Sequence, residues 1–205
     1  GVGDTTDMLM TLCFGVAGIA SPVEGVYDFN LGHFGIDKID PKSAIAAVTA
    51  SGNDHAAYDL SPDGAAELNK QIKTVEGIYY FSYAYSTTQE GKILGKHIPT
   101  ASTLPILSPF ALAMGAYKGT TAGGIEIDES WQENDGLVNV VSARYPSGEE
   151  YMSLPENAED ITRGIWNVAP VSKGDHGTVI GLNSKAQKTR EFFINLFTMI
   201  DTLER

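Results

Sequence analysis

The sequence predicts an α/β fold for this chain of 205 residues. From Asp59 onward, apolar segments of strand length alternate with segments of helical periodicity, which is typical of α/β proteins. Near its end, from Thr189 to Leu203, the chain has an amphipathic helical pattern with its apolar side chains on one stripe. Hydrophobic residues make up 42% and charged residues 20% of the sequence, as in ordinary globular domains, and the length suits one domain.

The first 57 residues differ from the rest, because they carry no strand pattern. A helix is predicted from Asp4 to Ala20, capped by polar residues at its start and stopped by Ser21-Pro22. A stretch punctuated by Gly and Asp follows over 25–41, and a short Ala-rich helix is predicted from Ser43 to Ala50. We therefore expect a lid-like helical region over 1–57 and a core region over 58–205.

The core region begins with a predicted helix, for which Pro62 suits the first turn. Further along, short apolar runs read as strands because they are rich in aromatic and β-branched residues. The predicted segments are a helix over 65–73, a buried strand over 77–86, a loop and helix over 104–116, and short strands over 137–142 and 164–171.

Charge and hydropathy narrow the classes of partner. The net charge of −12 and the pI of about 4.6 argue against nucleic acid, since a phosphate backbone repels such a surface. No apolar run reaches the roughly 18 residues that a membrane span needs, so stable membrane insertion is not expected. The single cysteine, Cys13, cannot form an intrachain disulfide and reads as a buried apolar residue. No signal peptide is visible at the N-terminus.

Two motifs carry candidate chemistry. The first is Glu133-Asn134-Asp135-Gly136-Leu137-Val138, which by itself reads as a turn and otherwise as a carboxylate presented at the edge of a sheet. The second is Lys173-Gly174-Asp175-His176-Gly177, a histidine in a glycine-flanked loop after a predicted strand. Asp135 precedes His176 by 41 residues and a helix follows, which is the order of the acid and base in the Ser-Asp-His sequence of α/β hydrolases.

The chemistry of ester hydrolysis needs all three groups. A serine is a poor nucleophile until a neutral imidazole takes its proton, and the imidazole needs a carboxylate to fix its tautomer. Asp135 and His176 can supply the carboxylate and the imidazole. The Gly-x-Ser-x-Gly elbow that carries the nucleophile occurs nowhere in the sequence.

Five segments together resemble the large bacterial triacylglycerol lipases of the staphylococcal and thermophilic Bacillus kind. One of them contains Tyr58-Asp59-Leu60, the others include the two motifs above, and the segments together are specific. In chain order, the matching segments are 26–35, 57–69, 134–138, 163–168 and 175–181. The resemblance covers nearly the whole chain and implies the C-terminal half of an α/β-hydrolase fold.

The resemblance also implies roles for individual residues. It makes Asp135 the acid and His176 the base of a Ser-His-Asp triad, with the serine on an N-terminal half outside this chain. The calcium ligands of the family follow its histidine, but the matching positions here are the neutral Thr178 and Asn183, so we expect no calcium requirement. Asp59 matches one zinc ligand of the family, whose other ligands lie in the N-terminal half.

The predicted function is therefore hydrolysis of lipid esters by a secreted lipase or carboxylesterase, with this chain inactive by itself. The alternative is a non-catalytic fragment or interaction module of a lipase-like protein. In either case we expect the chain to self-associate or to pair with an N-terminal half, because half of such a sheet leaves a strand edge open.

Overall fold

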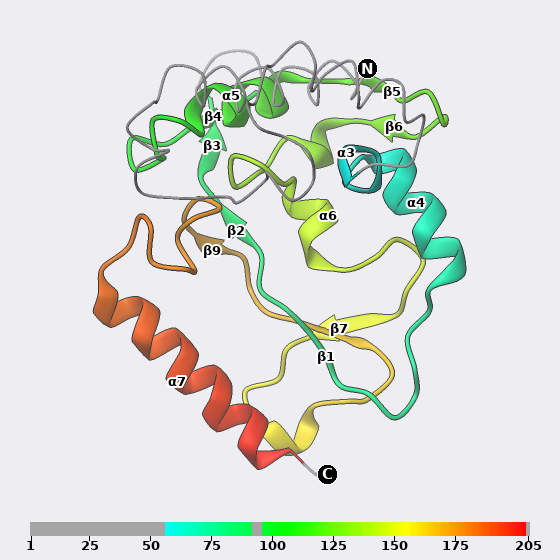
Figure 1. Ribbon diagram of the computed structural model, residues 1–205, viewed down its shortest axis with the longest axis vertical. Coiled ribbons are helices and arrows are strands. Elements are labelled where there is room, and N and C mark those ends of the chain that lie inside the picture. The colour runs from blue at the N-terminus through cyan, green and yellow to red at the C-terminus, as the bar shows by residue number, and fades with distance from the viewer. Residues whose placement is uncertain (1–55, 92–95, 204–205) are drawn as a thin grey trace, which may run out of the picture. The chain divides into compact units, whose positions relative to one another are not determined.

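The computed structural model describes residues 56–91 and 96–203. Residues 1–55 of the predicted lid-like region, with its helices at 4–20 and 43–50 and with Cys13, therefore lie outside the described residues. The chain separates into two compact units, one formed by residues 1–68 and 121–125 and the other by residues 69–120 and 126–205. The described part contains small sheets and helices in alternation, as the sequence predicted (Figure 1).

The first described helices are α3 (Ala56–Asp59) and α4 (Pro62–Gln71). Helix α4 begins earlier than predicted because Ser61 caps it: the Ser61 hydroxyl accepts a hydrogen bond of 3.1 Å from the Gly64 amide. A β-carbon at Gly64 would lie 2.1 Å from the Tyr58 carbonyl oxygen, so this contact with α3 requires glycine. The Asp63 carboxylate binds the loop at 121–125 by accepting from the Thr121 hydroxyl and the Gly123 amide.

A parallel three-stranded sheet lies in the second unit. Its strand order is β1 (Tyr80–Ser82), β8 (Trp166–Val168) and β7 (Tyr151–Ser153), so β1 is an end strand. Phe81 pairs with Asn167, which is fully buried and donates to the carbonyls of Tyr80 and Thr162. These bonds tie the middle of β8 to its neighbour and to the preceding loop.

The predicted strand over 77–86 is split into β1 and β2 (Tyr85–Ser86), and β2 pairs in parallel with β9 (Ser172–Lys173). Backbone bonds continue between the two pairs, from Ala169 to Ser82 and from Ser172 to Ala84. Three residues on one side thus face two on the other. The extra residue lies between Ala169 and Ser172, and the ladder bulges there.

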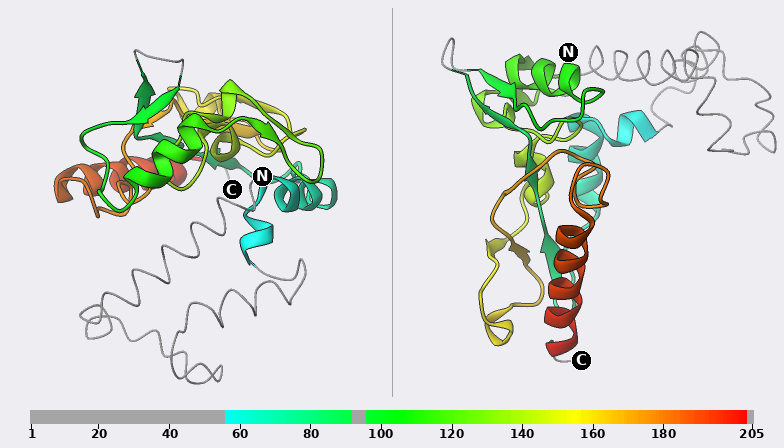
Figure 2. Two further views of the ribbon diagram at one scale, coloured as in Figure 1. Left: turned by 90° about the horizontal axis from the view of Figure 1, so that it is seen from above. Right: turned by 90° about the vertical axis from the view of Figure 1, so that its left-hand side faces the viewer.

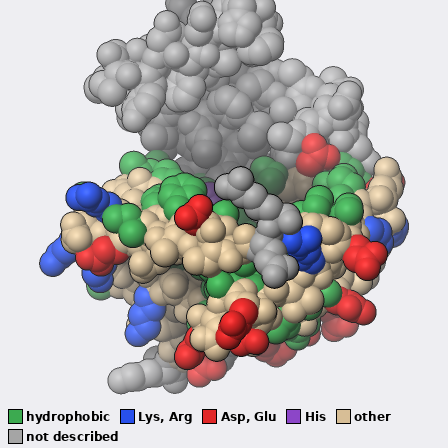
Figure 3. Space-filling view, turned by 90° about the horizontal axis from the view of Figure 1, so that it is seen from below, with side chains coloured by type: hydrophobic (Ala, Val, Ile, Leu, Met, Phe, Trp, Pro, Cys, Tyr) green, Lys and Arg blue, Asp and Glu red, His purple; other side chains and the backbone are tan. Residues whose placement is uncertain are grey.

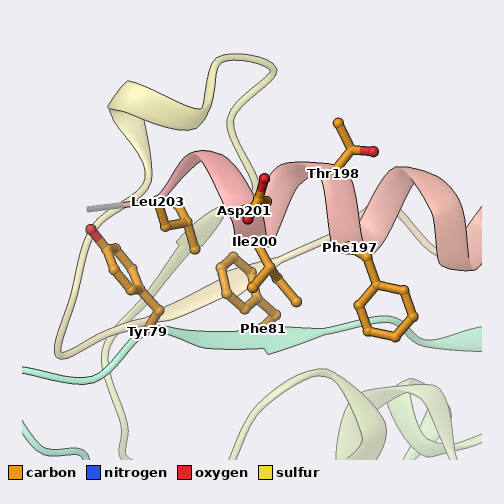
Figure 4. A pocket seen from close by; sticks show the side chains of 7 residues that line it. All are labelled: Tyr79, Phe81, Phe197, Thr198, Ile200, Asp201 and Leu203. Carbon is orange, nitrogen blue, oxygen red and sulfur yellow. The ribbon is translucent and has the colours of Figure 1, made fainter. Parts of the chain in front are cut away.

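Helix α7 (Ala186–Thr202) confirms the predicted C-terminal helix and packs along β1 (Figures 1 and 2). Its Phe192 ring meets the Tyr83 ring edge-on, with the centroids 5.2 Å apart. Further along, an open apolar groove separates the helix from β1, with Tyr79 and Phe81 on the strand side and Phe197, Ile200 and Leu203 on the helix side (Figure 4). No residue of α7 is fully buried.

The prediction of a strand over 137–142 is wrong: the structure has helix α6 at Val140–Arg144. The β-branched run favoured a strand, but the amides of Leu137 and Val138 are bound by the Asp135 side chain and cannot join a ladder.

Helix α5 (Ser108–Ala116) follows a loop as predicted. The remaining elements are β3 (Thr88–Glu90), β4 (His97–Pro99), β5 (Gly119–Thr120), β6 (Glu126–Ile127) and the 3-10 turns η2 (Glu129–Trp131) and η3 (Ala158–Asp160).

Within residues 56–91 and 96–203, no helix combines the length and the apolar character that crossing a bilayer requires.

Candidate active site

Asp135 lies in a tight turn that holds its carboxylate in a fixed orientation. Its Oδ1 accepts from the backbone amides of Leu137 at 2.9 Å and Val138 at 2.7 Å. Gly136 has a φ of +100°, and a β-carbon there would lie 2.9 Å from the Leu107 side chain, so glycine is needed on both grounds. With Oδ1 engaged and the residue 8% exposed, Oδ2 is the oxygen directed at a partner.

His176 reaches this turn because both segments lie at the carboxyl ends of the parallel pair β2–β9. The Gly174 amide, after β9, donates to the Ser86 carbonyl, and the Thr87 amide, after β2, donates to the Asn134 carbonyl. A third backbone bond joins the His176 amide to the Asp135 carbonyl at 2.8 Å. The carboxyl ends of parallel strands are the usual place for sites in such sheets.

The two predicted residues are in direct contact. The Nδ1 atom of His176 lies 2.9 Å from Oδ2 of Asp135, so the two residues that the sequence analysis singled out are within hydrogen-bond reach of one another. The hydrogen bond to Asp135 raises the pKa of His176 above its ordinary value, partly offset by burial and assisted by the charges of Asp135 and Asp175. The His176 side chain is 48% exposed, so its Nε2 side is open to a further group.

Asn134 supports the turn from behind and was not singled out by the sequence. Its side chain is fully buried, donates to the carbonyls of Ala111 and Gln132, and accepts from the Gly136 amide at 2.9 Å. The hydrogen bond to Ala111 therefore attaches Asn134, the residue next to Asp135, to helix α5. The Asn-Asp-Gly motif carried a signal for a turn, but the partners of Asn134 could not be read from it.

Asp175 is the other site residue to which sequence reasoning gave no role. It lies directly before His176, is 1% exposed, and accepts hydrogen bonds from several segments. Its position in the Asp-His-Gly motif was visible, whereas a carboxylate beside a solvent-facing histidine reads equally well as a surface residue.

Asp59, the one candidate metal ligand, is exposed at the end of α3. The sequence predicts no metal site among the histidines, of which His97 lies on β4 with its Nδ1 3.5 Å from the Thr88 hydroxyl. Among the residues that the structure describes, no group of three or more His, Cys, Asp or Glu side chains could hold a metal ion. His33 and His55 lie outside the described residues.

Comparison with known proteins identifies the family. Residues 2–204 match the family described as the lipase-like C-terminal domain. The chain belongs to this family. A lipase from Staphylococcus hyicus is 33% identical over 166 residues, which are 77% of this chain and 24% of the relative. A lipase from Staphylococcus epidermidis is 28% identical over 173 residues, or 80% of this chain and 23% of that protein.

Two solved structures resemble this chain in fold. The structure of EstA from Clostridium botulinum gives a TM-score of 0.74 at 28% identity, covering 95% of this chain and 49% of that one. The Staphylococcus hyicus lipase gives 0.70 at 26% identity, with 96% and 51% covered. The α/β fold of lipase type is thus confirmed, and the chain spans about half of these solved chains.

Proposed function

We propose that this chain supplies the acid and base of a lipid-ester hydrolase whose serine nucleophile lies on another segment. The observation that carries the proposal is the 2.9 Å contact between Asp135 Oδ2 and His176 Nδ1, with Oδ1 held by two backbone amides. The order of the two residues along the chain and the membership of the lipase-like C-terminal domain family support it.

In this mechanism, Asp135 accepts a hydrogen bond from the N–H group at Nδ1 of His176, which keeps the proton on Nδ1 and leaves Nε2 free to accept one. Nε2 takes the proton from the serine hydroxyl as the oxygen attacks the ester carbonyl, and returns it to the departing alkoxide. The raised pKa of His176 reflects the stabilisation of the imidazolium that forms in this step. The acyl group is then bound to the serine, and a water molecule, deprotonated by Nε2, attacks it. The bond to the serine breaks, the serine regains its proton from His176, and the fatty acid is released.

A lipid ester is the proposed substrate because apolar side chains are exposed beside the histidine. Ile180 is 66% and Leu182 is 68% exposed, both in the loop that follows His176. Hydrophobic side chains emerge between charged ones on the face shown in Figure 3. We also propose secretion, from the resemblance to staphylococcal lipases.

The isolated chain tests the proposal that the serine nucleophile lies on another segment. We expect the isolated 205-residue chain neither to hydrolyse a short-chain nitrophenyl ester nor to react with a fluorophosphonate probe, because it has no Gly-x-Ser-x-Gly elbow to activate a serine. The protein from the full reading frame should do both. Labelling of a serine within these 205 residues would contradict the proposal, and so would a full-length protein that neither reacts nor hydrolyses.

We further propose that the second unit pairs with another polypeptide surface, in full-length protein the N-terminal half. Strand β1 is an end strand of its sheet, and α7 leaves Phe197 62% and Ile194 50% exposed. An exposed apolar stripe beside an open strand edge marks an interface. Zinc binding through Asp59 would require ligands from that same other half.

The isolated chain is expected to self-associate through α7. Sedimentation velocity over a hundredfold range of concentration should show a species larger than the monomer, and Phe197→Ser should weaken association at least about tenfold, as loss of a central aromatic contact does. Ile180→Ser, an equally exposed apolar residue away from α7, is the matched control. A chain that stays monomeric throughout would contradict the pairing.

A further inference from the structure

Asp175 is a buried carboxylate that the proposed mechanism does not use. Its Oδ2 accepts from the Leu104 amide at 2.9 Å and from the Asn183 side-chain amide at 2.6 Å. Its Oδ1 accepts from the Gly177 amide and the Thr178 hydroxyl, each at 3.1 Å. A buried charge is tolerated only when its hydrogen-bonding capacity is filled, and these donors fill it.

These bonds join two segments that are far apart in the sequence. The Nδ2 atom of Asn183 donates both to Asp175 and, at 2.6 Å, to the Ser102 carbonyl. Together with the bond from Leu104, this clamps the loop 102–104 to the loop that carries His176. We call Asp175 and Asn183, with these bonds, the clasp.

The clamped loop leads into the helix that supports the acid. Helix α5 follows it, accepts a bond at Ala111 from Asn134, and is preceded by Leu107, which packs against Gly136. The contacts therefore run from Asp175 to the loop before α5, from α5 through Asn134 to the turn of Asp135, and from Asp135 to His176. Asp135 is thus anchored to α5 through Asn134, and His176 is anchored through Asp175 to the loop that leads into the same helix.

The residues of the clasp do not fit calcium, although the resemblance places calcium ligands at the positions of Thr178 and Asn183. The two side chains present hydrogen-bond donors to Asp175, and the set supplies a single carboxylate, whereas calcium sites gather several anionic oxygens. The side-chain NH₂ group of Asn183 thus lies between two oxygens, Asp175 Oδ2 and Ser102 O, and donates a hydrogen bond to each.

We infer that Asp175 and Asn183 are positioning residues that hold His176 against Asp135 without a metal ion. This inference rests on the proposed function, since it assigns the role of the histidine loop in that reaction. It predicts that loosening the clasp disturbs the acid-base contact itself, and that calcium has no part in it.

The test uses the protein from the full reading frame, with Asn183→Ala to remove the hydrogen bond to Ser102 and Asp175→Asn to remove the charge. The control is Asn157→Ala, because the Asn157 side chain donates to the exposed Asp160 carboxylate. The proton on Nδ1 of His176 gives a downfield resonance, assigned by its loss in His176→Gln. We expect both clasp variants to broaden or shift it and to lower kcat about 10- to 100-fold with KM within twofold, since small displacements of a catalytic group cost rates of this order.

The metal arm compares melting temperatures in millimolar calcium chloride and in a chelator. The parent should be unchanged, whereas Asn183→Asp, which sets two carboxylates face to face, should melt several degrees lower in chelator and recover in calcium. A parent that loses several degrees on chelation would overturn the inference, as would an Asn183→Ala variant with unchanged resonance and kcat. A parent without esterase activity but with a clasp-sensitive resonance would refute the proposed function and leave the clasp standing.

Discussion

Replacing His176 with glutamine in the complete protein is expected to lower kcat for ester hydrolysis about a millionfold, with KM little changed, because loss of the general base alone costs nearly as much as loss of a whole triad. Glutamine is similar in size and keeps a polar group near Asp135. It cannot shuttle a proton, so the serine stays protonated. Steady-state kinetics with a nitrophenyl ester measure the loss.

The control for this substitution is His97→Gln. His97 lies on β4 with its Nδ1 3.5 Å from the Thr88 hydroxyl, and within the described residues no hydrogen bond joins it to Asp135. Its replacement should leave kcat within twofold. If His176→Gln retained activity within tenfold of the parent, His176 would not be the base, and the triad assignment would fall with it.

The parts of the fold that the sequence predicted are those decided by local chemistry. Ser61 and Pro62 are sequence signals for the start of helix α4. The apolar residues of α7 recur with helical periodicity and so predict that helix. The positions of Asp135 and His176 could be predicted because each sits in a glycine-marked loop and because their order along the chain is informative.

What the sequence did not predict depends on partners distant in the chain. The apolar run at 137–142 favours a strand, but the Asp135 carboxylate binds its first amides and α6 forms instead. The predicted strand over 77–86 is divided opposite a bulge between Ala169 and Ser172, in a segment far along the chain. Asp175 meets Leu104 across 71 residues, a contact that no local pattern reports.

Asp135→Asn is expected to lower kcat/KM about 10⁴-fold, as the same change does in other serine hydrolases. Asparagine fits the turn, because its oxygen can still accept from the amides of Leu137 and Val138. Its NH₂ group then faces Nδ1 of His176, which must become an acceptor. The imidazole proton moves to Nε2, and the nitrogen that should receive the serine proton is blocked.

The pH profile distinguishes this effect from simple misfolding. The bond and charge of Asp135 raise the pKa of His176, so His176 is protonated and inactive as a base below that raised value. In Asp135→Asn this pKa falls, and the acid limb of kcat/KM should move to lower pH while the plateau drops. Asp160→Asn, an exposed carboxylate in η3, is the matched control and should change neither. An acid limb that stays in place or moves to higher pH would show that Asp135 does not act on His176.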